Sequence, residues 1–292
     1  MTMKKSGLIL FSPLRSLCLA ALASVVLLAG CETSVTDTTI KLPYQEELVV
    51  QGMISAGRPV ENILVTRTLP PLQVWSIDAA ELKDAEVTVR SGERTWKLEY
   101  VSYGRYAAED LVPEEGKTYE MEARWNGLTV KATTYVPFTP TVDSIVLRYR
   151  TGECFGATDT ALVVVTYPAP EEGVVYRALS YASVGEGRDS TLYLLQPGYR
   201  VYRTKDTDGD GQLSIEALTR CYFGEEERTE MDTIIVDVEG YEPAFYDYYT
   251  TKDNNNRGPF EGDPTAITWN VSGDGFGYFF GRAIARQTVV LQ

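Results

Sequence analysis

The sequence predicts a mainly β fold, in which an antiparallel sandwich precedes a second antiparallel β domain that carries one short helix. Two observations lead to this prediction. Short segments rich in β-branched and aromatic residues recur along the chain, and several alternate apolar with polar side chains. Glycine or proline clusters separate them, which is typical of sandwiches built from many short strands.

The first β domain is expected at residues 45–138. Its strands are expected at residues 48–55, 62–69, 85–91, 95–101, 119–125 and 128–136. Pro137 and Pro140 then break the pattern, because proline has no N–H to donate to a neighbouring strand. We therefore place a domain boundary there.

Residues 85–123 contain the patterns A-x-V-T-V, G-x-Y and L-x-P-x-x-G-x-x-Y in that order. This order resembles the immunoglobulin-like and prealbumin-like sandwiches that accompany bacterial surface proteins. The resemblance implies turns at Gly104 and Gly116. It also implies inward-facing strands that start at Tyr106 and Tyr119.

The second β domain is expected at residues 141–292. Its strands are expected at residues 143–150, 161–169, 174–184, 190–196 and 232–240, with further strands around a glycine-rich turn at the end of the chain. The one helix is expected from Glu242 onward. Pro243 suits a first helical turn, and the stretch from Phe245 to Tyr249 has aromatic residues at helical spacing.

The tyrosines of this helix raise a choice between binding and packing. Tyr246, Tyr248 and Tyr249 are candidates for stacking on a sugar or a peptide. Packing of the helix on the second sheet is the favoured alternative, because aromatic stripes at helical spacing usually face cores.

Residues 1–30 have the layout of a lipoprotein signal peptide. A basic start with Lys4 and Lys5 precedes an apolar run, which ends in Leu-Ala-Gly before Cys31. This ending resembles the lipobox of bacterial lipoproteins and implies lipidation of Cys31; an ordinary secretory signal is the alternative. Residues 31–44 are then a polar tether, and we expect an outer-membrane anchor in a leaflet that the sequence does not specify.

Charge and composition narrow the classes of function. The 292-residue chain has a formal net charge of −14, and loss of the three positive charges in residues 1–30 makes it −17. Such a chain repels phosphate backbones, which argues against a nucleic-acid partner. The sequence contains no histidine, which excludes imidazole relays. Acid–base catalysis would have to rely on groups such as the paired carboxylates of glycosidases.

Two cysteines remain once Cys18 leaves with the signal peptide and Cys31 is lipidated. Cys154 and Cys221 form an even pair in an exported chain, so a disulfide is expected; two free thiols are the alternative. The bond would close a long loop and contribute about 4 kcal/mol in the chain-entropy model.

The stretch KDTDGDGQLSIEA at residues 205–217 resembles the first half of a calcium loop. Its candidate ligands for a structural Ca²⁺, the only cofactor suggested, are Asp206, Asp208, Asp210 and the Gln212 carbonyl. An EF-hand is excluded, because Ala217 occupies the position of the bidentate glutamate. A solvated Asp/Gly turn is the alternative.

The C-terminal part of the chain resembles a family of Bacteroidota outer-membrane lipoproteins, domain of unknown function 4249. The residues that carry the resemblance are Tyr246, Tyr248, Tyr249, Pro264, Asn270, Gly277, Tyr278 and Phe279. Such proteins tend to be encoded beside TonB-dependent transporters, so the resemblance implies an accessory role in nutrient uptake. It implies no catalytic residues.

The leading hypothesis is a non-catalytic lipoprotein that assists an outer-membrane transporter or captures its ligand. A surface adhesin or matrix-assembly protein is the alternative from another class. A glycan hydrolase that uses only carboxylates is a third hypothesis, and it requires two facing acidic side chains in a groove.

Overall fold

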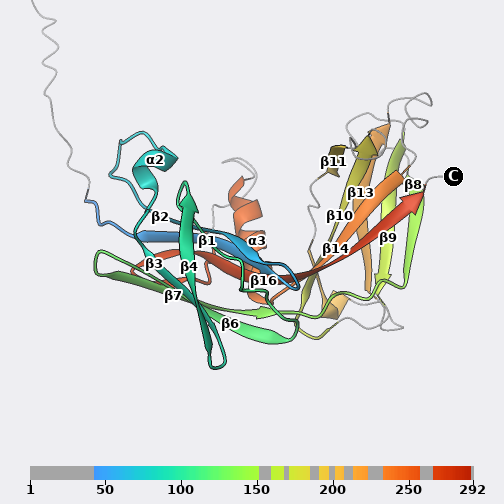
Figure 1. Cartoon of the computed structure of the whole chain (residues 1–292). Helices are drawn as coiled ribbons and strands as arrows, with labels where there is room; N and C mark the ends of the chain where they lie inside the picture. The colour runs from blue at the N-terminus through green and yellow to red at the C-terminus, as the bar shows by residue number, and fades with distance from the viewer. Residues whose placement is uncertain are drawn as a thin grey trace, which may run out of the picture. The chain divides into compact units, whose positions relative to one another are not determined.

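The computed structural model describes residues 43–150, 159–167, 171–184, 191–196, 201–206, 213–222, 233–256 and 266–290. The fold is mainly β, with one helix of more than one turn among the described residues (Figure 1). The prediction of the fold class is confirmed.

Seven strands and one short helix come first. They are β1 (Leu48–Ser55), β2 (Val60–Arg67), α2 (Ile77–Ala80), β3 (Glu86–Ser91), β4 (Arg94–Ser102), β5 (Arg105–Ala108), β6 (Lys117–Trp125) and β7 (Leu128–Val136). The short helix α2 was not expected; the side chain of Ser76 caps its N-terminus by accepting a hydrogen bond from Ala79 N.

The remaining elements extend to the end of the described chain. They are β8 (Ser144–Arg150), β9 (Asp159–Tyr167), β10 (Val175–Val184), β11 (Thr191–Gln196), β12 (Tyr202–Arg203), β13 (Leu213–Tyr222), β14 (Thr233–Tyr241), α3 (Ala244–Asn256), β15 (Ser272–Gly273) and β16 (Gly275–Val290). The helix α3 lies where the sequence predicted one.

Alternation of apolar and polar residues builds the first core. In β1, Leu48, Val50, Gly52 and Ile54 are buried, while the residues that alternate with them are more exposed. Tyr106 and Tyr119 point inward, 1% and 2% exposed, as the sandwich pattern implied. The first half of β4 pairs with β3 and its second half pairs with β5. This strand therefore connects the two groups of strands around the core.

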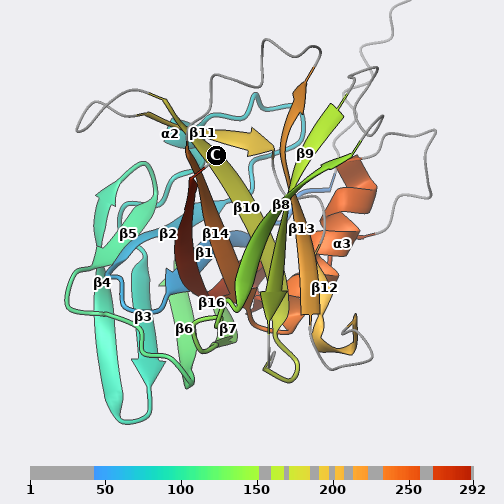
Figure 2. The same ribbon diagram turned by 90° about the vertical axis from the view of Figure 1, so that its right-hand side faces the viewer.

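The last strand, β16, joins two groups of strands. Its first half runs parallel to β1, from Leu48 opposite Gly275 to Ser55 opposite Arg282. Its second half runs antiparallel to β14. The resulting order is β11-β10-β14-β16-β1-β2-β5-β4-β3-β6-β7-β15, and Figure 2 shows β10, β14 and β16 side by side.

The glycine-rich end has strands on both sides of a bend, as expected, and the bend lies at Asp274 between β15 and β16. From Gly275 onward the segment is one unbroken strand. Gly277 serves close packing: its φ is 132°, and a Cβ there would lie 1.8 Å from the Val50 carbonyl oxygen. The glycines therefore let β16 approach β1.

A smaller sheet of order β13-β9-β8 completes the described fold. Tyr44–Gln292 form one compact unit, and residues 1–42 lie outside the described chain. The boundary expected after residue 138 stays a prediction. β16 does bring a C-terminal segment into the first sheet.

Candidate functional site

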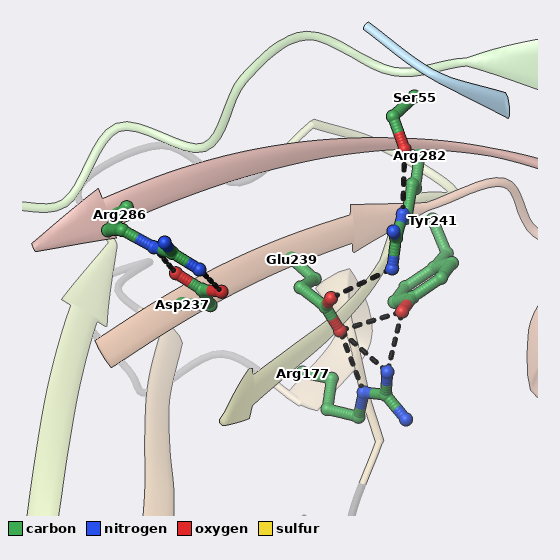
Figure 3. A network of polar contacts seen from close by, with 7 residues as sticks. All are labelled: Ser55, Arg177, Asp237, Glu239, Tyr241, Arg282 and Arg286. Atoms are coloured by element: carbon green, nitrogen blue, oxygen red, sulfur yellow. Dashed lines mark hydrogen bonds and ion pairs between the residues drawn. The ribbon is translucent and has the colours of Figure 1, made fainter. Parts of the chain in front are cut away.

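One face of the sheet carries a buried network of charges centred on Glu239 of β14 (Figure 3). Arg177 of β10 donates to Glu239 Oε2 from Nε and Nη2, at 2.9 and 2.6 Å. Arg282 of β16 donates to Oε1 at 3.1 Å, and its Nε donates to Ser55 Oγ at 2.8 Å. The network thus ties together four strands.

Strand register brings these side chains together. Arg177 lies directly opposite Glu239, Tyr241 opposite Arg282, and Asp237 opposite Arg286. Residues directly opposite in neighbouring strands share one face of the sheet, so the polar positions of β14 meet the arginines of its neighbours. Asp237 and Arg286 form a second, bidentate pair with both distances 2.6 Å.

An aromatic cluster adjoins the network. The Tyr241 ring stacks on Phe245 of α3 with centroids 3.8 Å apart, and the Arg177 guanidinium lies 5.3 Å from the Tyr241 ring. Burial, together with the nearby Glu239 carboxylate, raises the pKa of the Tyr241 hydroxyl. Tyr241 therefore stays neutral and donates its hydrogen bond to Glu239 Oε2 at 2.6 Å.

Next to Arg282 the same face opens into a pocket of about 710 Å³. Its lining residues are Gln51, Gly52, Met53, Asn62, Leu64, Trp75, Ile77, Tyr103, Arg105, Tyr278 and Arg282. Pockets of ~300–1,000 Å³ are typical of sites for small ligands. The pocket is the candidate binding site.

A single row across four strands forms part of the pocket lining. Tyr278 of β16 lies opposite Gln51 of β1, which lies opposite Leu64 of β2, which lies opposite Arg105 of β5. Trp75 joins the lining from the segment before α2, and Tyr103 joins it from the turn between β4 and β5; their side chains are 68% and 57% exposed.

The pocket offers hydrogen-bonding groups that the described residues leave without partners. Gln51, Asn62 and Arg105 have no side-chain hydrogen bond or ion pair to another described residue. Aspartate and glutamate do not occur among the described lining residues. The pocket thus presents amide and guanidinium groups beside aromatic rings, which suits recognition of a polar ligand.

A buried carboxyl group lies between β7, β16 and the start of α3. Glu242 is 6% exposed, and burial raises its pKa to about 7. Hydrogen bonds from Thr134 and Asn270 act in the opposite direction, because they stabilise the charged carboxylate. Asn270 also accepts from Phe279 N at 2.9 Å and donates to Phe279 O at 2.8 Å. The Asn270 side chain thus bonds the backbone N–H and C=O of Phe279 in β16, as a neighbouring strand would do.

Most of the cysteine and calcium predictions fall outside the described residues. Cys31, Cys154 and the side chain of Cys221 lie outside them, and so do Asp208, Asp210 and Gln212. Asp206 ends a short 3₁₀ turn, Thr204–Asp206, and accepts a hydrogen bond from Arg203 N at 2.7 Å. In the described part of the chain no cluster of acidic or cysteine side chains is arranged to hold a metal ion.

The three helix tyrosines are not among the residues that line the pocket. Tyr248 is 5% exposed, and its ring lies 5.0 to 5.6 Å from those of Tyr278, Phe280 and Trp269. Tyr246 lies under the Arg203 guanidinium at 3.9 Å, and Tyr249 packs near Phe245. For Tyr248 the geometry is that of a core residue.

Comparison with known families extends over nearly the whole chain. A family model described as domain of unknown function (DUF4249) matches residues 35–288. The chain belongs to this family. No curated protein matches this DUF4249 chain. None of its described helices has the length and apolar character needed to cross a membrane.

In this DUF4249 protein, the sequence pointed to no pocket, and of its lining residues it singled out Tyr278 alone, as part of the family resemblance. Trp75 had a usable signal, because it is a large aromatic residue in a proline-rich connection between strands, and binding residues are disproportionately found on such loops. Arg105 and Gln51 had none, since their meeting depends on the register of four strands.

Proposed function

We propose that this DUF4249 protein is a lipid-anchored, non-catalytic binding protein of the outer membrane that captures a ligand for a TonB-dependent transporter. The observation that carries the proposal is the pocket over the β16-β1-β2-β5 row. Its exposed aromatic rings and unbonded amide and guanidinium groups are what a recognition site requires.

The sequence supports the location and the partner. The leader that ends at Cys31 favours acylation, and more than one acyl chain would make attachment effectively permanent. The family resemblance supports a transporter as partner. Leu72 and Val74, 92% and 86% exposed beside Trp75, add an apolar surface of the kind that a protein partner covers.

Purification of the lipoprotein in mild detergent tests the partnership. A β-barrel transporter should co-purify in stoichiometric amount. Recovery of the lipoprotein alone, with binding to cells or matrix instead, would favour the adhesin alternative. Labelling with a fatty-acid analogue tests the anchor: the wild type should be labelled, and label on a Cys31→Ala variant would contradict lipidation at this residue.

A further inference from the structure

We propose that the pocket binds an anionic saccharide, whose acid group pairs with Arg105 and whose sugar rings lie against Trp75 and Tyr103. This inference rests on the proposed function and adds the class of ligand. Three features of the pocket lead to it: the sign of its charge, its exposed rings, and the absence of a free backbone edge on its central strands.

The charge of the pocket is opposite to that of the chain. The formal net charge of the whole chain is −14, yet the charged residues among the described pocket lining are both arginines. Arg282 is already paired at 3.1 Å with the Glu239 carboxylate, which it shares with Arg177. Arg105 has no carboxylate within ion-pair distance among the described residues, so its planar guanidinium is available for a carboxylate or a sulfate of the ligand.

Two aromatic rings reach the pocket from different connections. Trp75 and Tyr103 are 68% and 57% exposed, although large aromatic side chains usually bury most of their surface. A pyranose ring has one flat face of C–H groups and a rim of hydroxyls. Such a ring covers an exposed indole or phenol and keeps its hydroxyls free for hydrogen bonds.

The strands below the pocket favour a saccharide over an extended peptide. β1, β2 and β5 are each paired on both sides, so a peptide finds no free N–H and C=O groups for strand addition there. Recognition must come from side chains. The amides of Gln51 and Asn62 both donate and accept, which matches hydroxyls that do the same.

Calorimetry on the full mature lipoprotein in detergent micelles tests the ligand class. The probes are a galacturonic-acid tetrasaccharide, its fully methyl-esterified form and a sulfated galactose tetrasaccharide. The first two have the same rings and differ in charge. We expect the acid to bind at least about tenfold more tightly than the ester, because a charge-assisted pair is lost with the ester. The sulfated probe distinguishes a carboxylate site from a general anion site.

Two substitutions connect the binding to named residues. Arg105→Gln should remove the preference for the acid over the ester, whereas Arg58→Gln, at an exposed position outside the pocket, should keep it. Trp75→Ala should weaken binding of acid and ester alike by about tenfold or more. Phe138→Ala, at a 57% exposed aromatic residue outside the pocket, is its control.

Two results would overturn the assignment. One is the absence of the predicted effect of charge: equal affinity of the wild type for acid and ester, or an Arg105→Gln variant that keeps the wild-type preference for the acid. The other is no binding of any of the three saccharides. If a β-barrel still co-purified in that case, the ligand class would be wrong while the proposed accessory function stood.

Discussion

At the scale of single residues, Glu239 is the buried anion on which the charge network depends. It is 2% exposed and accepts hydrogen bonds from Arg177, Arg282 and Tyr241. Breaking such a pair from one side leaves positive charge buried without compensation, which costs more than the pair contributes over an apolar replacement.

Glu239→Ala should lower the free energy of unfolding by about 3–5 kcal/mol, because two arginines lose their counter-charge. Asp237→Ala is the matched control on the same strand and face. Its partner Arg286 has a side chain that is 48% exposed, so water can replace the lost contact and about 1 kcal/mol should be lost. Urea unfolding at neutral pH measures both values, and equal losses would contradict the role given to Glu239.

Glu242 should make stability depend on pH. Its pKa rises from 4.5 to about 7 on folding, so the folded state holds the proton more tightly than the unfolded state. The stability from this proton is complete below pH 4.5 and is lost as the pH rises to about 7, where the buried charge costs about 3 kcal/mol.

Glu242→Gln should therefore match the wild type at pH 4 and exceed its stability at pH 8. Glu61→Gln, at an exposed site, controls for the change in net charge. Thermal unfolding between pH 4 and pH 8 measures the difference. A Glu242→Gln curve parallel to that of the wild type would show that the carboxyl is not the source of the pH dependence.

At the scale of elements, β16 depends on glycine at several positions. A Cβ on Gly277 would lie 1.8 Å from the Val50 oxygen, and one on Gly281 would lie 2.2 Å from the Tyr135 oxygen. Both neighbours are backbone atoms, which a rotamer change cannot move. The strand therefore tolerates no side chain there without separating from β1 or β7.

Gly277→Ala should destabilise the fold by about 3 kcal/mol or more, because the backbones of β1 and β16 must separate. Gly92→Ala is the control: Gly92 also has a positive φ, 57°, but nothing lies within 4 Å of a Cβ there. The Gly92→Ala variant should lose only about 1 kcal/mol of folding stability, from backbone strain. Chemical denaturation compares the two variants, and similar losses would show that strain, not contact, sets the cost.

The strands were predictable where the determinants are local. The predicted bounds of β1 and β7 match the structure, since alternation and flanking turn residues define them. Gly104 and Gly116 take the positive φ values, 74° and 69°, that their turns need. The single strand β16 was not predictable, because its glycines read as turn residues until β1 is placed beside them.

The candidate site was less predictable than the fold, because it is made by register. Tyr278, Gln51 and Arg105 meet through pairings between strands far apart along the chain. The acidic and aromatic positions of β14 alternate visibly in the sequence, yet their arginine partners on β10 and β16 follow only from the sheet order. Long-range pairing leaves no local pattern.

At the scale of the whole molecule, the first β region is completed by the last strand. β1 has β2 on one side and β16 on the other. Without β16, one edge of β1 would expose its N–H and C=O groups, and the apolar residues beneath would lose Phe279, which is fully buried in the first core.

Residues 44–138 expressed alone should therefore fail to fold cooperatively. Amide hydrogen exchange should show little protection in β1, whereas the segment 44–290 should show strong protection there. A cooperative, protected fold of residues 44–138 would contradict this dependence and would support an independent first domain.

The pairing of Ser55 with Arg282, 227 residues later, has a consequence for biogenesis. Strand β1 cannot complete its pairing until β16 has been synthesised, so the nascent polypeptide stays incompletely folded until that point. For a chain exported as proposed, this delay would keep the polypeptide extended enough to be threaded through a secretion channel. In the interval, a holding chaperone would have to shield the open edge of β1 from other chains.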